Sequence, residues 1–153
     1  MKIINPMIAA GCLPKEEQVL QKVASVYNEE ARKNDMNYTV SLNEIKGYDR
    51  KQFIAEARQM SAYFLRGIKQ VKNPENPTDV MLKNKYSLTQ VGMIIGMKDH
   101  STVLHSAKAI EVRKNTNQLL IPNSRFDEIK NTVCDIYSTD ILMDDVVYHN
   151  TTT

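Results

Sequence analysis

Apolar residues recur every three or four positions along much of the chain, the spacing that places side chains on one face of a helix. Polar and charged residues fill the positions between them. The residues that carry the pattern are Val19, Leu20, Val23, Tyr27 and Ala31; Phe53, Ala57, Met60, Phe64 and Ile68; Val103, Ala107 and Ile110; and Phe126, Ile129, Val133 and Ile136. The pattern predicts an all-α fold, a helical bundle within the single domain that 153 residues allow.

Turn-forming residues separate the predicted helices. The first helix is expected to begin after Pro14 and to end near residues 34–35. Residues 36–47 are expected to form a loop with a short turn at "SLNEIKG". The last helix is expected to begin at Asn123 or Ser124, directly after a proline.

The second helix is expected to run from about Arg50, with Arg58 and Arg66 pointing away from its apolar face. The sequence "NPENP" at 73–77 then breaks any helix. Proline has this effect because it lacks the backbone N–H and disfavours helical geometry in the residue before it. A further short helix is expected over residues 78–84.

The stretch that follows carries the strongest local signals. Ser87 and Gln90 have the spacing of a capping box, in which each side chain bonds the other residue's backbone at a helix start. Gly96 is expected to end this helix, and Asp99 has the position of an N-cap for the next one. Two helices joined by a short turn with glycine at the bend form a helix-turn-helix.

The formal net charge of +2 hides an uneven distribution. Residues 46–116 carry thirteen basic and six acidic side chains, whereas residues 117–153 carry two basic and six acidic ones. A basic middle segment is typical of a surface that faces a polyanion, although a solvated lysine-rich face would give the same counts.

Several other classes of protein are disfavoured. Cys12 and Cys134 are far apart and form no CxxC pair, which excludes a zinc finger and suits a reducing, cytoplasmic compartment. No apolar run approaches the ~18 residues of a membrane span, so no membrane partner is expected. The chain has no glycine-rich phosphate loop, so neither a nucleotide nor another cofactor is expected.

The motif "MKDHSTVLHSAKAI" at 97–110 gathers histidines, an aspartate and hydroxyl groups. His100 and His105 are five residues apart, so they project about 140° apart around a helix and do not form a metal-binding pair. Asp99, His100 and Ser101 are consecutive, and on one helical turn they cannot hydrogen-bond in series as a catalytic triad. Neither a metal site nor an enzyme is therefore expected.

Helix capping and DNA recognition remain as interpretations of this motif. Capping explains Asp99 but leaves the outward histidines and the surrounding basic residues unexplained. These basic residues are Lys98, Lys108, Arg113 and Lys114. In a helix-turn-helix, the first residues of the second helix contact base edges in the major groove, and here they are Asp99, His100 and Ser101. Thr102 and the free amides of the helix start suit a phosphate oxygen.

The sequence "YSLTQVGMIIGMKDHSTVLHSAKAIE" at 86–111 resembles the C-terminal DNA-binding domain of the bacterial replication initiator DnaA. Its core, "DHSTVLH" at 99–105, is specific to that family. The sequence "ARQMSAYFLR" at 57–66 is similar to the helix that comes before it there. The resemblance covers roughly residues 15–135 and is strongest over 86–111.

The resemblance implies a role for each matching residue. Base contacts are implied for Asp99, His100 and Ser101 in the major groove, for Thr89 at a thymine methyl group, and for Arg50 in the minor groove. Phosphate contacts are implied for Lys98, Thr102, His105, Arg58, Gln59 and Arg66, and Lys108 is expected to join them as one of the basic residues around the motif. The implied partner is double-stranded DNA with a DnaA-box-like site.

The chain also departs from the family. Its first 50 residues cannot hold the ATPase module that precedes this domain in DnaA, so a stand-alone DNA-binding protein is expected. Asp49 and Glu56 occupy positions that are strongly basic in the family, and Met97 replaces a glycine in the turn. Extra residues form an insertion at 67–86.

Together these features predict an N-terminal extension (1–14), a helix-turn-helix domain (15–138) and a flexible acidic tail (139–153). The predicted function is sequence-preferring DNA binding in the control of replication or transcription. The predicted setting is the nucleoid of a bacterial cell or a phage-infected host. The alternative is a protein-interaction module that kept the fold and uses the insertion at 67–86 or the tail to bind a partner.

Overall fold

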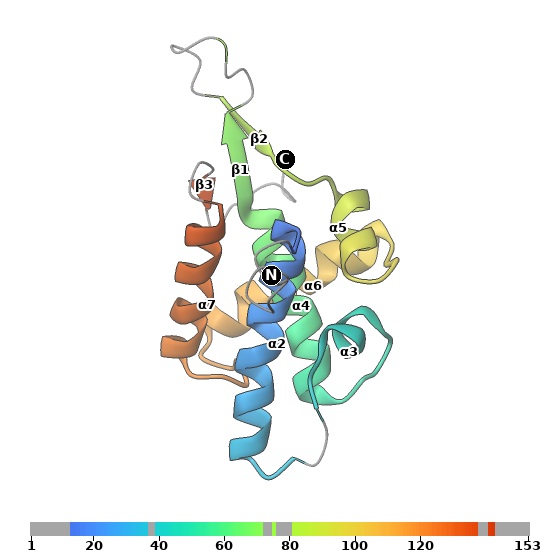
Figure 1. Cartoon of the computed structure of the whole chain (residues 1–153), viewed down its shortest axis with the longest axis vertical. Coiled ribbons are helices and arrows are strands. Elements are labelled where there is room, and N and C mark those ends of the chain that lie inside the picture. The colour runs from blue at the N-terminus through green and yellow to red at the C-terminus, as the bar shows by residue number, and fades with distance from the viewer. Residues whose placement is uncertain (1–12, 37–38, 72–74, 76–80, 138–140, 143–153) are drawn as a thin grey trace, which may run out of the picture.

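The computed structural model describes residues 13–36, 39–71, 75, 81–137 and 141–142. Within these residues the chain forms helices α2 (Lys15–Lys33), α3 (Leu42–Lys46), α4 (Gln52–Gly67), α5 (Leu88–Ile94), α6 (His100–Asn115) and α7 (Asn123–Ile136) (Figure 1). Three short strands accompany them: β1 (Ile68–Val71), β2 (Leu82–Asn84) and β3 (Ile141–Leu142). The all-α class predicted from the sequence is confirmed, and the small sheet is an addition.

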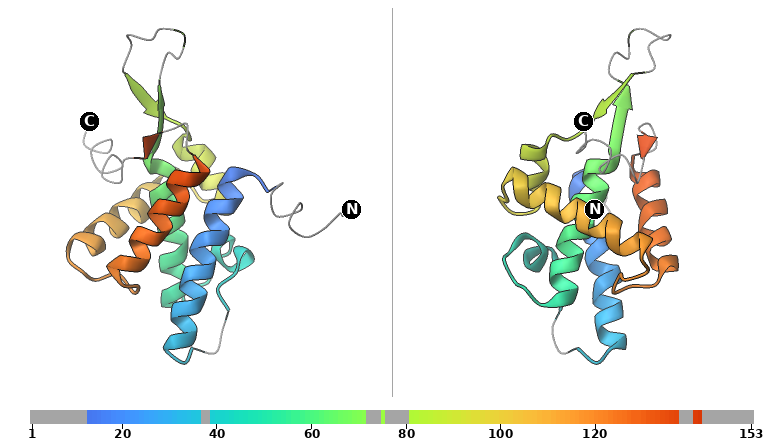
Figure 2. Two further views of the ribbon diagram at one scale, coloured as in Figure 1. Left: turned by 60° about the vertical axis from the view of Figure 1, so that its left-hand side comes forward. Right: turned by 180° about the vertical axis from the view of Figure 1, so that it is seen from behind.

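Helix α4 forms the centre of the bundle. Twelve of its 16 residues are buried, because α2 packs against one side and α6 against another. Figure 2 shows α6 crossing α4 when the molecule is seen from behind. An aromatic cluster of Tyr63, Phe64 and Phe126 joins α4 to α7, with ring centroids 5.2 to 5.9 Å apart. The central position of α4 places the two helices α5 and α6 on one side of the molecule.

The helix expected over residues 78–84 is wrong where the structure describes it. Leu82–Asn84 forms β2, which pairs antiparallel with β1 in the register Lys69 with Asn84 and Val71 with Leu82. Residues 78–80 lie outside the described part of the chain. A strand forms here because β1, at the end of α4, offers backbone partners that the local sequence does not reveal. The described part of the 67–86 insertion therefore contains an antiparallel pair of strands.

Ile68 is buried as the sequence predicts, but it belongs to β1 and not to the second helix. Strand β3 pairs with the other edge of β1, where Ile68 is opposite Leu142, so the strand order is β2-β1-β3. Two residues of the predicted flexible tail are thus paired in the sheet, and the others lie outside the described residues, as do residues 1–12. No helix in the described ranges is long and apolar enough to cross a membrane.

Candidate nucleic-acid interface

Helices α5 and α6 are joined by a short turn in the segment predicted to be a helix-turn-helix, and both start with the predicted caps. The Gln90 amide N–H donates to Ser87 Oγ at 3.1 Å, and the Ser87 N–H donates to Gln90 Oε1 at 2.8 Å, which completes the capping box. The Thr102 N–H donates to Asp99 Oδ1 at 2.8 Å at the start of α6. These bonds satisfy amides that the first turn of each helix leaves without a partner.

The turn between the two helices is held close to the rest of the domain. Gly96 has a φ of +103°, and a Cβ atom there would lie 1.9 Å from the carbonyl oxygen of Lys46. A Cβ on Gly92 would lie 2.1 Å from the carbonyl oxygen of Lys98. Met97, which follows with a φ of +66°, occupies the left-handed region that glycine tolerates better, and its side chain is exposed.

The exposed side of α6, with its N-cap, carries half of the twelve residues predicted to contact DNA. Val103, Ala107 and Ile110 are buried as predicted. The exposed residues are Asp99 at the cap and His100, Ser101, Thr102, His105 and Lys108 along the helix. The tertiary structure therefore leaves this predicted set accessible to a partner.

Two of the predicted base-contacting residues touch each other across the helix-turn-helix. Thr89 on α5 and His100 on α6 are both exposed, and Thr89 Oγ1 lies 2.6 Å from His100 Nε2. This hydrogen bond fixes the orientation of the imidazole ring through Nε2, the ring nitrogen farther from the backbone. The hydrogen bond from the Thr102 backbone N–H also keeps the pKa of the Asp99 carboxyl below its usual value, and the nearby His100 and His105 lower that pKa further. Asp99 is therefore ionised at neutral pH and presents carboxylate oxygens beside the imidazole.

Arg58 holds the loop that precedes α4. Its guanidinium donates from Nε to the carbonyl of Ile45 at 2.6 Å, from Nη2 to that of Glu44 at 2.9 Å, and from Nη1 to that of Asp49 at 3.1 Å. Two of these carbonyls belong to the last turn of α3, the negative end of that helix. Burial lowers the pKa of Arg58, although a guanidinium stays charged at neutral pH. Because a guanidinium has five N–H donors, two remain for a phosphate.

Lys98 secures the same loop from the side of the helix-turn-helix. Its Nζ donates to the carbonyls of Lys46 and Gly96, both at 3.1 Å, and lies 3.8 Å from the centre of the Tyr48 ring. Burial lowers its pKa, and the charge of Arg58 lowers it further. An ammonium group has three donors, so one remains after these two bonds.

Arg66 differs from its prediction. Its side chain does not face away from the core, because the residue is only 5% exposed and Nη1 donates to the carbonyl of Tyr86 at 2.9 Å. Lys69 is buried close by, and the charge of Arg66 adds to burial in lowering the pKa of Lys69 to about 8. We therefore leave Arg66 out of the interface.

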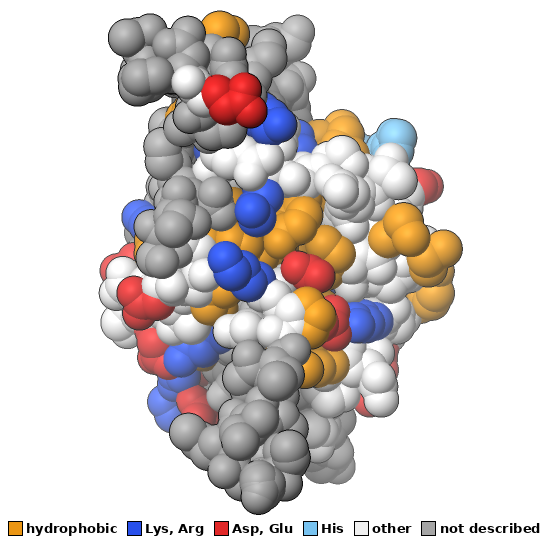
Figure 3. All heavy atoms as spheres, turned by 45° about the horizontal axis from the view of Figure 1, so that its top comes forward, with side chains coloured by type: hydrophobic (Ala, Val, Ile, Leu, Met, Phe, Trp, Pro, Cys, Tyr) orange, Lys and Arg blue, Asp and Glu red, His pale blue; other side chains and the backbone are white. Residues whose placement is uncertain are grey.

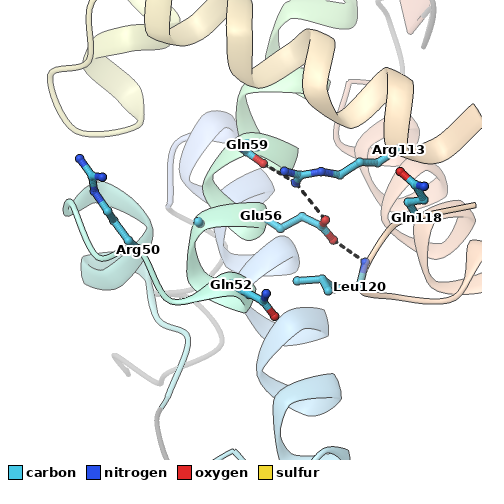
Figure 4. Close-up of a pocket in the computed structure, with 8 residues that line it drawn as sticks. Arg50, Gln52, Glu56, Gln59, Arg113, Gln118 and Leu120 are labelled. Carbon is cyan, nitrogen blue, oxygen red and sulfur yellow. Dashed lines mark hydrogen bonds and ion pairs between the residues drawn. The ribbon is translucent and has the colours of Figure 1, made fainter. Parts of the chain in front are cut away.

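Arg50 lies in the loop between α3 and α4 and is exposed. Among the residues that the structure describes, its guanidinium makes no hydrogen bond or ion pair, and it points away from Glu56 in Figure 4. The neighbouring Asp49 is engaged elsewhere, because its carboxylate accepts from the Lys51 N–H at 2.9 Å and from Lys51 Nζ at 3.1 Å. The acidic residue beside Arg50 therefore does not neutralise it.

Glu56, the second of the two acidic residues noted in the sequence near Arg50, is buried and does not face a DNA or protein partner. Its Oε2 accepts from the Tyr27 hydroxyl and from the Leu120 N–H, both at 2.8 Å, and Arg113 lies 3.2 Å from Oε1 (Figure 4). Burial, followed by the charge of Glu56, raises the pKa of Tyr27 well above its ordinary value. The sequence held a signal for this burial, because Glu56 shares the helical spacing of Phe53 and Met60.

A pocket of about 420 Å³ lies beside the start of α6 and collects basic and polar side chains from three separate segments. It is lined by Tyr48, Arg50, Ala55, Arg58, Gln59, Lys98, Thr102 and Ser106. Five of the residues that the sequence assigns to DNA are in this list. Phosphate oxygens would find guanidinium, ammonium and hydroxyl donors here.

The surface around the helix-turn-helix also carries apolar side chains. Hydrophobic atoms gather at the right-hand edge of Figure 3, the side on which α5 lies in Figure 1, and the exposed apolar residues of this segment are Met93 and Met97. A histidine lies at the same side of the surface in that view. Within the described residues, no three His, Cys, Asp or Glu side chains are grouped so that they could hold a metal ion.

Comparison with known proteins agrees with the resemblance seen in the sequence. Over 96 residues, 63% of this chain, the sequence is 30% identical to the chromosomal replication initiator protein DnaA of Picosynechococcus sp.. The match covers 17% of that protein, so the chain spans less than a fifth of this relative's length. No family model and no solved structure matches the chain. The identity supports the presence of a DnaA-related domain in this protein.

Proposed function

We propose that this protein binds double-stranded DNA with sequence preference, through α6 placed in the major groove, in the control of replication initiation or transcription. The observation that carries the proposal is the exposed start of α6, where His100 bonds Thr89 beside a pocket lined by Arg50, Arg58 and Lys98. The similarity to a protein named as a replication initiator favours replication as the process.

The first turn of α6 reads the bases in this proposal. The Asp99 carboxylate accepts a hydrogen bond from cytosine N4, while His100 and Ser101 bond the edges of neighbouring bases. Thr89 places its methyl group near a thymine methyl, and Arg50 enters the minor groove. The bond between Thr89 and His100 limits the freedom of both side chains before DNA arrives, which reduces the entropy lost on binding.

Phosphate contacts fix the position of the protein on the duplex. The residues proposed for them are Lys98, Arg58, Gln59, Thr102, His105 and Lys108. Because each neutralised phosphate releases condensed counterions, the logarithm of the binding constant is expected to fall by about 0.9 per log unit of salt for each contact.

Fluorescence anisotropy tests this proposal, with a labelled duplex carrying a DnaA box and a scrambled duplex of equal length at two salt concentrations. The expected result is a preference for the DnaA box and weaker binding to both duplexes at high salt. Lys33→Ala, at the end of α2, serves as a control that removes a positive charge from a helix outside the proposed interface. No binding to either duplex at low salt contradicts the proposal.

A protein-interaction role is the second candidate, and one observation favours it. Met81 and Leu82, at the edge strand β2, are 59% and 37% exposed, and an edge strand can pair with another chain. This candidate requires that no salt-sensitive DNA binding is found. It also requires that Leu82→Lys weakens association with the partner.

A further inference from the structure

A second pocket adjoins the one beside the start of α6. It has a volume of about 350 Å³ and shares Arg50, Ala55 and Gln59 with the first, so the two form one groove along α4. Its lining is Arg50, Gln52, Ala55, Glu56, Gln59, Arg113, Gln118 and Leu120 (Figure 4). The other five residues, Gln52, Glu56, Arg113, Gln118 and Leu120, do not line the first pocket.

The groove follows α6 for most of its length. Thr102 lines the first pocket and Arg113 lines the second, and eleven residues separate them on the same helix. At 1.5 Å per residue this separation is about 16 Å along the helix axis. A DNA strand rises about 3.4 Å per nucleotide along the duplex axis, so a groove of this length spans several nucleotides.

Hydrogen-bond donors remain available in the second pocket. Arg113 uses Nη1 for both of its bonds, to Glu56 Oε1 at 3.2 Å and to Gln59 Oε1 at 2.7 Å. Its Nη2 and Nε make no hydrogen bond with the residues that the structure describes. Gln118 is exposed, and its side-chain amide has no hydrogen-bond partner in the same part of the chain, whereas its backbone N–H donates to the carbonyl of Arg113 at 2.7 Å. Two separate segments therefore offer donors to one space.

The carboxylate in this pocket does not repel an anion strongly. The side chain of Glu56 is 2% exposed, and its oxygens already accept from Tyr27, Leu120 and Arg113. Its effect is to aim the guanidinium of Arg113 across the pocket, as Figure 4 shows. The positive charges of Arg50 and Arg113 then face the groove with only this buried, paired negative charge between them.

We propose that the second pocket binds the phosphate backbone of the same DNA molecule outside the base-reading site, with Arg113 and Gln118 as its contacts. This inference rests on the proposed function. Arg50 lines both pockets. If Arg50 enters the minor groove, the base-reading site in the major groove lies on one side of Arg50 and the second pocket lies on the other. The backbone at the far side of that minor groove is the segment that reaches Arg113.

The test compares a duplex limited to the recognition site with one extended by about one helical turn, roughly 10 base pairs, on each side. Gln118→Glu places a negative charge in the pocket at an exposed residue whose side chain makes no hydrogen bond within the described part of the chain. Asn115→Asp is the matched control, because it adds the same charge at an exposed residue of α6 that lines a different pocket. Thermal unfolding followed by circular dichroism verifies that both variants keep the fold.

The unsubstituted protein is expected to bind the extended duplex more tightly and with a steeper salt dependence. Gln118→Glu is expected to lose about fivefold in affinity for the extended duplex and to flatten its salt slope by about 0.9 for each phosphate lost. Its affinity for the short duplex and its preference for the recognition sequence should stay unchanged. Asn115→Asp should behave as the unsubstituted protein on both duplexes.

Two results overturn the inference while leaving the proposed function in place. One is that the unsubstituted protein binds both duplexes with equal affinity and equal salt slope. The other is that Gln118→Glu binds the extended duplex as tightly as Asn115→Asp does. If the unsubstituted protein binds neither duplex at low salt, the proposed function fails and the inference fails with it.

Discussion

Replacing the buried Glu56 by alanine tests how the domain joins α2, α4, α6 and the segment before α7. The carboxylate accepts hydrogen bonds from Tyr27 and Leu120 at Oε2 and pairs with Arg113 at Oε1. The Tyr27 residue is fully buried, so without Glu56 its hydroxyl has no acceptor and no access to water. Glu56→Ala is therefore expected to destabilise the fold.

The size of the effect follows from these three partners. A buried hydroxyl left without a partner costs about 1 to 3 kcal/mol, and the lost bond to the Leu120 N–H adds about 1 kcal/mol. Arg113 adds little, because its side chain is 38% exposed and the guanidinium regains water. The expected loss in the free energy of unfolding is about 2 to 4 kcal/mol.

Two further variants separate the hydrogen bonds from the ion pair. Glu56→Gln keeps an oxygen at the Oε2 position that serves both Tyr27 and Leu120, so it should lose only about 1 kcal/mol. Adding Tyr27→Phe to Glu56→Ala removes the stranded hydroxyl and should restore about 1 to 2 kcal/mol.

Urea denaturation followed by circular dichroism measures the free energy of unfolding of each variant. The reasoning is refuted if Glu56→Ala loses less than about 1 kcal/mol, or if Tyr27→Phe destabilises the Glu56→Ala protein further. Either result would mean that the buried carboxylate does not supply the acceptor that Tyr27 requires.

Three further outcomes are expected. Burial lowers the pKa of Lys69 from 10.5 in the unfolded chain to about 8 in the folded protein, so folding releases a proton between these pH values. The free energy of unfolding should therefore rise across that pH range, by about 3 kcal/mol at most. In urea titrations at pH values on either side of 8, Lys69→Met should abolish this rise. Met97→Gly should stabilise the fold by about 0.5 to 1 kcal/mol, because glycine tolerates the left-handed backbone at this position. Gly96→Ala should cost about 2 kcal/mol or more, because the new Cβ would lie 1.9 Å from the carbonyl oxygen of Lys46. Thermal melts in which both variants shift the melting temperature in the same direction would contradict this prediction. In the anisotropy titration, His100→Ala should remove about 1 to 3 kcal/mol of discrimination between the DnaA box and a scrambled duplex. Lys108→Ala should instead weaken binding to the two duplexes by the same factor. If both variants lose affinity equally for the two duplexes, the assigned roles are contradicted.

Much of the fold and of the candidate site could be read from local sequence. The spacing of apolar residues predicts α2, α4, α6 and α7, because a helix closes its hydrogen bonds within four residues. The caps at Ser87 and Asp99 involve residues only three positions apart, and the structure has both of them. The same spacing leaves His100 and His105 on the exposed side of α6.

Other features depended on contacts between distant parts of the chain. Leu82–Asn84 is a strand only because β1 lies beside it, and a short segment without a clear period has no strong preference of its own. Arg66 follows the helical spacing of an exposed residue, yet it is buried and its guanidinium donates to the carbonyl of Tyr86, 20 positions away.

The sequence by itself determined where α2, α4, α6 and α7 lie, which residues cap α5 and α6, and which residues at the start of α6 are exposed. Only the tertiary structure decided which polar groups meet. Glu56 bonds residues that are 29, 57 and 64 positions away, and the groove that runs from Thr102 to Arg113 combines side chains of α4, α6 and three loops. Local spacing cannot specify such sites, because the partner of a buried charge is chosen by the packing of whole helices and by the cost of leaving that charge unpaired.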